Sequence, residues 1–134
     1  MGPMADFVHL HVHSDFSLLD GLSKVQDLAA AAVEMGMSSL ALTDHGVMFG
    51  ILHFYHAAKK AGIKPIVGCE TYISPRRMTQ KEATRDAKST PLILLAENQT
   101  GYHNLMQIAT AAQLEGFYYR PRVDREYLAV HAEG

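Results

Sequence analysis

The chain has 134 residues, of which 48% are hydrophobic and 19% are charged, and its formal net charge is −2 at pH 7. This length suits one ordinary domain or part of a larger one, and the apolar content is that of a globular protein with a buried core. The slightly negative charge excludes a general electrostatic attraction to nucleic acid or to an anionic membrane, so contact with DNA would need a local basic patch.

Cysteine usage and the N-terminal residues set the expected compartment. The single cysteine, Cys69, excludes an internal disulfide and fits a reducing compartment. Because it precedes Glu70 on a predicted strand, it should face the opposite way, as a small core residue. No apolar run has the length of a membrane span and no secretory signal opens the chain, so we expect a cytoplasmic protein. We interpret residues 1–6 as a tag scar followed by a native start, and residues 7–134 as part of one domain.

Three histidines alternate with apolar residues near the N terminus, in the run Val8-His9-Leu10-His11-Val12-His13. A period of two is typical of a β-strand, and it would put His9, His11 and His13 on one face. Same-face positions lie roughly 6.5–7 Å apart, so neighbouring imidazoles can reach one metal ion or one cluster. The pattern therefore predicts a strand that packs on one face and binds metal on the other.

Apolar periodicity predicts alternating helices and strands up to residue 70. Ser23 and Gln26 have the spacing of a capping box at the start of a helix. A second helix is expected to turn Ile51, Leu52, Tyr55 and Ala58 inward, and the strand after it is expected to end at Glu70. The predicted elements are helices at 23–36 and 49–61 and strands at 38–43 and 65–70.

The second half of the chain begins with a polar segment, Ser74 to Thr90, which carries five basic and two acidic residues. We interpret it as a mobile solvated loop, with phosphate contact through Arg76 and Arg77 as the alternative. A fourth strand is predicted at 92–96, a helix capped by Thr100 at 100–116, and a last helix that starts at Asp124.

Strands that alternate with helices predict right-handed β-α-β units and a parallel sheet, either a barrel or a doubly wound sheet. Metal-ligating residue types lie at the carboxyl ends of the predicted strands: His11 and His13, Asp44 and His45, and Glu70. Both kinds of α/β fold place their sites at the carboxyl ends of the strands. The sequence thus predicts one site at that edge, and its four strands suggest half of a barrel.

Six runs of the sequence, in order and at matching spacing, resemble the N-terminal polymerase and histidinol phosphatase (PHP) domain of the bacterial DNA polymerase III alpha family. They are Phe7–Ser14, Leu18–Gly21, Leu42–Gly46, Gly62–Glu70, Thr100–Tyr102 and Phe117–Arg125. The last run is typical of the polymerase branch of the family. The resemblance implies a distorted, TIM-like (β/α) barrel of parallel strands, of which this chain is the N-terminal part, with up to three metal ions at the strand ends.

The resemblance implies five metal ligands by position: His11, His13, Asp20, His45 and Glu70. His9 and Asp44 are expected to orient these ligands without binding the metal themselves, because a ligating imidazole needs its other nitrogen held by a hydrogen bond. For Asp44, an ordinary turn residue is an equal alternative. Mixed histidine and carboxylate ligation suits zinc, manganese or iron.

One position departs from the family pattern. Thr90-Pro91 stands where members with full metal sites place a histidine, so a sixth ligand is missing. His103 is a conceivable substitute, but we interpret it as an exposed or packed histidine. Further ligands of the family would lie beyond Gly134, so this chain is expected to hold fewer than three ions.

The resemblance implies a metal-dependent phosphoesterase of the 3′-5′ exonuclease, or proofreading, type, in a chain whose DNA polymerase activity resides in a later domain. The rival interpretation is a catalytically degraded module that docks a separate proofreading exonuclease subunit, and a stand-alone phosphatase is third. The implied partners are the rest of the polymerase alpha chain, DNA and that exonuclease subunit. Contact with nucleic acid is expected at Arg76, Arg77, Tyr119 and Arg120, with packing against the rest of the polymerase as the alternative.

Overall fold

The computed structural model describes residues 7–134, so the expected tag scar and native start lie outside the described residues. Strands and helices alternate as predicted, with a one-turn helix, α3, and a two-residue strand, β4, as additions. No helix in this part of the chain has the length and apolar character needed to cross a membrane. The elements are α1 (Val25–Glu34), β1 (Ser39–Leu42), α2 (Ile51–Ala61), β2 (Lys64–Ile73), α3 (Ala83–Asp86), β3 (Thr90–Leu95), α4 (Gln99–Leu114), β4 (Arg122–Val123) and α5 (Arg125–Val130).

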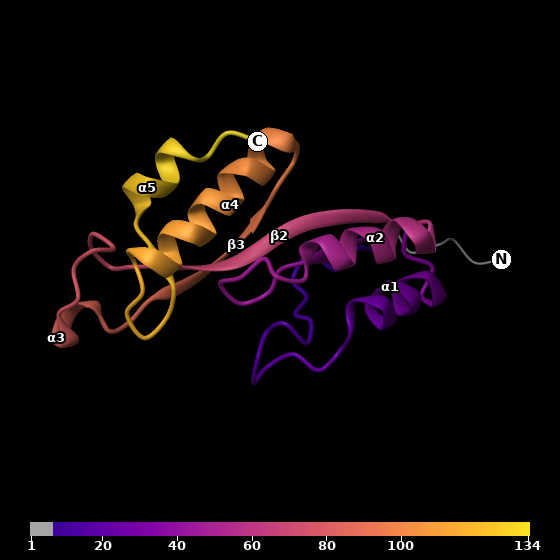
Figure 1. Ribbon diagram of the computed structural model, residues 1–134, viewed down its shortest axis with the longest axis horizontal. Coiled ribbons are helices and arrows are strands. Elements are labelled where there is room, and N and C mark those ends of the chain that lie inside the picture. Colours follow the sequence, from indigo (N-terminus) through magenta and orange to yellow (C-terminus); the bar gives the residue numbers. More distant parts are fainter. Residues whose placement is uncertain (1–6) are drawn as a thin grey trace.

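The central strand of the sheet is β2, which runs along the long axis of the molecule (Figure 1). Its first four residues pair in parallel with β1, whereas its last six pair antiparallel with β3. Its last two residues also pair in parallel with β4. The predicted all-parallel sheet is therefore wrong at β3. Parallel strands need a crossover connection, and residues 74–89 carry only the single turn of α3, so the chain returns beside β2 in the opposite direction.

Two apolar clusters lie along β2, one toward each end (Figure 1). The first joins α1, α2 and β1, and Phe54 and Leu42 at its centre are completely buried. The second joins α4 to β4 and to the segment before α3, through Ile108, Val123 and Met78. Of the metal-ligand candidates of the sequence, His45 follows β1 and Glu70 lies on β2, whereas His11, His13 and Asp20 precede α1.

Helix α2 buries two of the four residues that were predicted to point inward, Ile51 and Ala58. Ile51, Phe54 and Ala58 are buried, whereas Leu52 is 63% and Tyr55 43% exposed. The expectation that Leu52 and Tyr55 point inward is wrong, because Phe54, which has no polar group to satisfy, takes the core position between them. The helix ends as expected at Gly62, which adopts a left-handed conformation with φ +82°.

Of the three helices for which the sequence predicted a start, only α5 begins with the predicted capping residue. Lys24 precedes α1 and makes no side-chain capping bond, so the capping box predicted at Ser23 is wrong. Asn98, and not Thr100, caps α4, since its Oδ1 accepts hydrogen bonds from two backbone amides at 2.8 and 3.2 Å. Asp124 caps α5 as predicted, through a bond of 2.8 Å to the amide of Tyr127.

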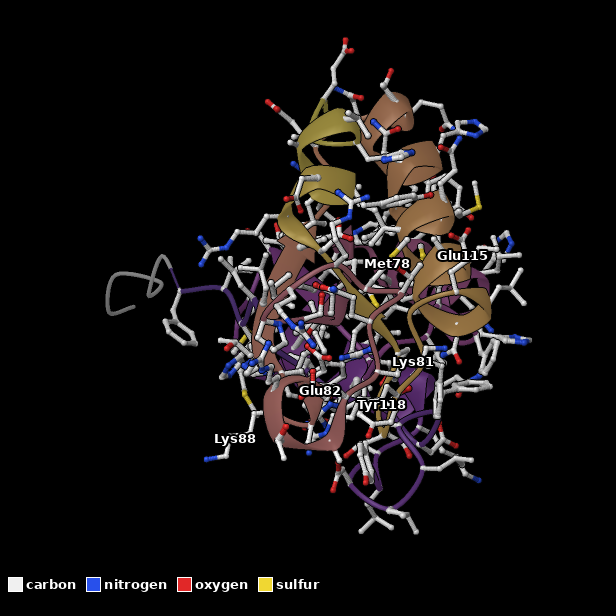
Figure 2. All side chains as sticks on the ribbon, turned by 90° about the vertical axis from the view of Figure 1, so that its left-hand side faces the viewer. Met78, Lys81, Glu82, Lys88, Glu115 and Tyr118 are labelled. Carbon is white, nitrogen blue, oxygen red and sulfur yellow. The ribbon has the colours of Figure 1, made fainter. Side chains whose placement is uncertain are left out.

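The segment 74–89 is tied down by Arg122, which is fully buried. Its guanidinium donates to four backbone carbonyls at 2.9 to 3.1 Å, three of them in the segment, those of Met78, Gln80 and Asp86. Figure 2 views this end of the molecule and shows Lys88 pointing away from the body. The expectation of a loop without secondary structure is thus wrong, because α3 forms there and the hydrogen bonds from Arg122 fix the backbone of the segment.

The histidine run is extended but does not form the predicted strand. The carbonyls of His9 and Val12 accept hydrogen bonds from the amides of Ala41 and Thr43, at 3.0 and 2.8 Å. An advance of three residues in the histidine run, from 9 to 12, therefore matches an advance of two residues beside it, from 41 to 43. A local mismatch of this kind interrupts the alternation of side chains, as a β-bulge does. The prediction that three histidines share one face fails for this reason.

Candidate metal centre

Two histidines of the N-terminal run converge on the carboxylate of Glu70. The Nε2 atoms of His11 and His13 lie 2.9 and 2.6 Å from the same Glu70 Oε2. One ligand atom from each of the three residues lies within 4.8 Å of the other two. Two imidazole nitrogens and a carboxylate oxygen this close together are a donor set that fits zinc, manganese or iron.

His45 and Asp20 extend this donor set on one side. His45 Nδ1 lies 3.4 Å from Glu70 Oε2, and His45 Nε2 lies 3.1 Å from Asp20 Oδ2. The rings of His13 and His45 are 3.9 Å apart between centroids. All five predicted ligands therefore meet in one cluster, although they come from three separate stretches of the chain.

Backbone pairing with β2 sets the position of His45. After β1 ends, the chain continues beside β2, where the amide of Glu70 donates to the carbonyl of Asp44 at 3.0 Å and the amide of Gly46 donates to the carbonyl of Glu70 at 2.8 Å. Glu70 does not end its strand, as was predicted, because β3 and β4 extend the pairing of β2 to Ile73. The glutamate thus sits on a rigid, centrally paired stretch.

Cys69 is a core residue, as predicted. It alternates with Glu70 on β2, and its side chain is fully buried. Burial and the nearby carboxylate of Asp44 raise the pKa of the Cys69 thiol to about 12. The thiol therefore stays protonated at neutral pH and is a poor metal ligand.

The carboxylate of Asp44 holds the loop that follows the histidine run. Its Oδ1 accepts from the Ser14 amide and the Ser17 hydroxyl, both at 2.6 Å, and its Oδ2 accepts from the Ser14 hydroxyl at 2.8 Å. Ser17 Oγ in turn accepts from the amide of His45 at 3.1 Å. Asp44 thus positions the loop between His13 and Asp20, and it does so through serines instead of the imidazole contact that was expected.

His9 is separated from the cluster. It lines an apolar cavity of about 230 Å³ beside α1, together with Val12 and Leu28. Its ring packs edge-on against Phe7, with 4.7 Å between centroids. Among the described residues its imidazole makes no hydrogen bond, so the structure offers no contact through which His9 would orient a ligand.

Hydrogen bonding favours the charged form of Glu70. Burial opposes ionisation of this carboxyl, but hydrogen bonds from His11 and His13 and the proximity of His45 outweigh it, so the pKa of Glu70 lies below its usual value. The carboxylate is therefore ionised at neutral pH and available to a cation.

Tyr72 belongs to the centre and was missed by the sequence analysis. Its side chain is 3% exposed, and its hydroxyl hydrogen-bonds to Nδ1 of His45. Burial and the charge of Glu70 raise the pKa of Tyr72, so the phenol stays protonated. The signal in the sequence was the period of two along β2, which puts residue 72 on the same face as Glu70.

The four residues predicted to touch nucleic acid fall into two groups. Arg76 and Arg77 lie in the segment 74–89 and form ion pairs with carboxylates of this chain, Arg76 with Asp86 at 2.6 Å. Tyr119 is 70% exposed and Arg120 lies over the ring of Tyr72, at the edge of the metal centre. Of the four residues, Arg120 is the one that contacts a side chain of the centre.

The position of the missing sixth ligand also borders the centre. Pro91 is directly opposite Tyr72 in the antiparallel pair of β2 and β3. Residues that face each other in this way share one side of the sheet. A histidine at position 91 would therefore point to the side of Glu70 and Tyr72. His103 is exposed on α4 and is not part of the cluster.

Comparison with known families and proteins gives consistent matches. The family model of the PHP domain matches residues 9–134. The DNA polymerase III subunit alpha of Treponema pallidum is 54% identical over 129 residues, and that of Borreliella burgdorferi is 50% identical over the same length. Each alignment covers 96% of this chain and 11% of the relative, so the chain spans about a tenth of the length of these polymerase subunits.

Two solved structures share the fold. An amidohydrolase from Chromobacterium violaceum, with bound sulfate and no metal, matches with a TM-score of 0.54 and 24% identity, over 78% of this chain and 34% of the other. A proposed metal-dependent phosphoesterase from Bifidobacterium adolescentis matches with a TM-score of 0.51 and 17% identity, over 79% of this chain and 34% of the other. The mixed α/β arrangement described above is thus found within two longer chains.

Proposed function

We propose that this chain, which belongs to the PHP domain family, acts as a metal-dependent phosphoesterase within a bacterial replicative DNA polymerase alpha subunit. The observation that carries the proposal is the convergence of His11, His13 and Glu70 on one point. Relatives of 50 and 54% identity are polymerase III alpha subunits, which supports the polymerase context over a stand-alone phosphatase.

The residues of the centre would have different roles in binding a divalent ion. His11, His13 and Glu70 would bind it, and His45 and Asp20 enlarge the donor set on the side of Tyr72. A bound ion would polarise a phosphate oxygen and make a nearby water more acidic, which is the chemistry of phosphoester hydrolysis. Tyr72 holds the Nδ1 edge of His45, so the Nε2 edge stays directed at Asp20.

The substrate we propose is the 3′ end of a DNA strand, so that the activity is a 3′-5′ exonuclease of the proofreading type. We further propose that the full domain closes into a distorted PHP-type barrel, in which the mixed sheet described here is one part. Polymerisation would reside in a later domain of the same cytoplasmic protein, and the rest of the alpha chain would be its first partner. The short share of the polymerase relatives that this chain spans supports that division.

A second function is favoured by one observation. Pro91 occupies the position on β3 that faces the centre beside Tyr72, so the cluster has five candidate ligands and lacks a sixth. An incomplete centre is compatible with a docking module that binds a separate proofreading exonuclease subunit and performs no hydrolysis. Retained metal without hydrolysis would identify this function.

The test is elemental analysis of the full-length protein, combined with degradation of an oligonucleotide labelled at its 3′ end. We expect bound zinc, manganese or iron in the unmodified protein, and loss of metal and hydrolysis in His11→Ala and His45→Ala. His56→Ala, on the exposed side of α2, is the matched control and should retain both. Absence of metal from the unmodified protein would sink the phosphoesterase proposal, and metal without hydrolysis would favour the docking function.

A further inference from the structure

We infer that Arg120 binds a phosphate group of the substrate beside the metal centre, an inference that rests on the proposed function. The guanidinium carbon of Arg120 lies 4.8 Å from the centroid of the Tyr72 ring. The hydroxyl of the same tyrosine hydrogen-bonds to His45. Only one side chain therefore separates Arg120 from a predicted ligand.

A tight turn with an unusual backbone presents Arg120 at this place. The amide of Tyr118 donates to the carbonyl of Arg120 at 3.0 Å, and Tyr119 between them has φ +60°. A left-handed conformation is uncommon for a residue with a side chain and is found preferentially at functional sites. The turn leaves Tyr119 in solvent and directs Arg120 over Tyr72.

The residues after Arg120 fix the turn to the rest of the protein. Pro121 packs against Gly46, where an added Cβ would lie only 2.3 Å from Pro121 Cγ. Gly46 directly follows His45, so this contact joins the turn to the centre. Arg122 is fully buried and bonded to four carbonyls. Arg120 is thus an exposed side chain on a firmly held backbone, which reduces the entropy lost when it binds a ligand.

The charge of Arg120 has no carboxylate partner among residues 7–134. Arg76, Arg77 and Arg85 each form an ion pair with a carboxylate, whereas none is found for Arg120. Arginine presents a planar fork of donors that matches two oxygens of a phosphate. An unpaired arginine beside a cluster of metal ligands is therefore well placed to bind the non-bridging oxygens of a phosphoester held at that cluster.

The first measurement uses inorganic phosphate and the manganese-loaded full-length protein, with broadening of the ³¹P resonance as the readout. Because a hydrogen bond to a charged group contributes about 1.5–3 kcal/mol, Arg120→Ala should weaken phosphate binding about tenfold or more. Arg120→Lys keeps the charge without the fork and should restore the affinity in part. Arg85→Ala removes an exposed arginine of α3 and is the matched control, with unchanged affinity.

The second measurement separates this role from a structural one. With a 3′-labelled oligonucleotide, Arg120→Ala should raise KM at least as much as it lowers kcat, while the metal content and the thermal unfolding midpoint stay at the values of the unmodified protein. Equal phosphate affinity in Arg120→Ala and in the control, at full metal content, would overturn the inference and leave the proposed function standing. Failure of the unmodified protein to bind metal would overturn both.

Discussion

Two irregular segments of this molecule are each organised by one buried charged side chain of opposite sign. The loop 14–20, beside the metal centre, is held by the carboxylate of Asp44, which is 2% exposed and accepts three hydrogen bonds from serines. The segment 74–89, at the far end of β2, is held by Arg122, which is fully buried and donates to four carbonyls. A single buried charge can thus replace regular secondary structure, provided that its hydrogen bonds are satisfied.

The difference lies in what each charge supports. Asp44 binds donors in the stretch that connects two predicted ligands, His13 and Asp20, so its removal should affect both stability and metal binding. Arg122 binds carbonyls remote from the centre, except that it anchors the turn of Arg120. We therefore expect its removal to act on stability first.

The largest effect should come from Arg122→Met, which keeps much of the side-chain volume and removes every donor. Several buried carbonyls would lose their partner, and each unsatisfied acceptor costs about 1–3 kcal/mol, so we expect the free energy of unfolding to fall by about 3–4 kcal/mol. Urea unfolding measures this, with Arg125→Met on the exposed start of α5 as control. A loss below about 1 kcal/mol, within the range of surface substitutions, would show that Arg122 does not organise the segment.

The next effect should come from Asp44→Asn, which keeps the shape and one acceptor oxygen. Hydrogen bonds to a charged acceptor contribute about 1.5–3 kcal/mol, so we expect a loss of about 2 kcal/mol in unfolding free energy. Residues that position metal ligands also influence the affinity for the metal, so we expect metal binding to weaken about tenfold.

Asp15→Asn is the control for that change, since Asp15 is the exposed neighbour in the same loop. Isothermal titration with manganese and urea unfolding are the two measurements. If Asp44→Asn loses stability but keeps full metal affinity, Asp44 is a turn residue only. The buried charges of segments 14–20 and 74–89 would then both serve stability alone.

The sequence predicted which residues lie together better than it predicted the fold around them, and metal binding by these residues stays a prediction. His11, His13, Asp20, His45 and Glu70 were all expected, and all meet in one cluster. The histidine run and the polar residues at strand ends follow from local patterns, whereas the set of five, with Asp20 in it, is what the resemblance to the PHP family implies by position. Tyr72 was missed, since a tyrosine two residues beyond Glu70 carries no signal until the strand is known to continue.

The errors in the predicted fold have a common physical cause. The direction of β3 depends on how residues 74–89 return to the sheet. That path depends on Arg122, whose hydrogen bonds reach the carbonyls of Asp86 and Met78, 36 and 44 residues earlier in the sequence. Likewise, the position of His9 depends on the mismatch between the histidine run and β1. Neither contact is encoded in local periodicity, so neither could be predicted from it.

A smaller effect concerns acid stability and tests the segment 74–89 alone. The Arg76 guanidinium hydrogen-bonds to Asp86 and lowers the pKa of that carboxyl to about 2, below the value of about 3.9 in an unfolded chain. Between these values the unfolded chain binds more protons, so the free energy of unfolding should fall as the pH drops from about 4 to about 2. Urea unfolding across this range should show a shallower decline in Asp86→Asn than in Asp15→Asn. Identical slopes in the two variants would contradict the assignment.

The smallest effect on stability, and the most informative one on the centre, is expected from Pro91→His. Position 91 is exposed on β3, so the free energy of unfolding should change by no more than about 0.5 kcal/mol. Pro91 faces Tyr72 across the antiparallel pair, with Cβ atoms of such pairs about 4.5–5.5 Å apart, so a histidine there would add a nitrogen donor beside His45. Thr90→His puts the same ring on the other side of the strand. Elemental analysis should find more metal per chain in Pro91→His than in Thr90→His, and equal metal in the two would mean that the centre is limited by something other than a missing donor on β3.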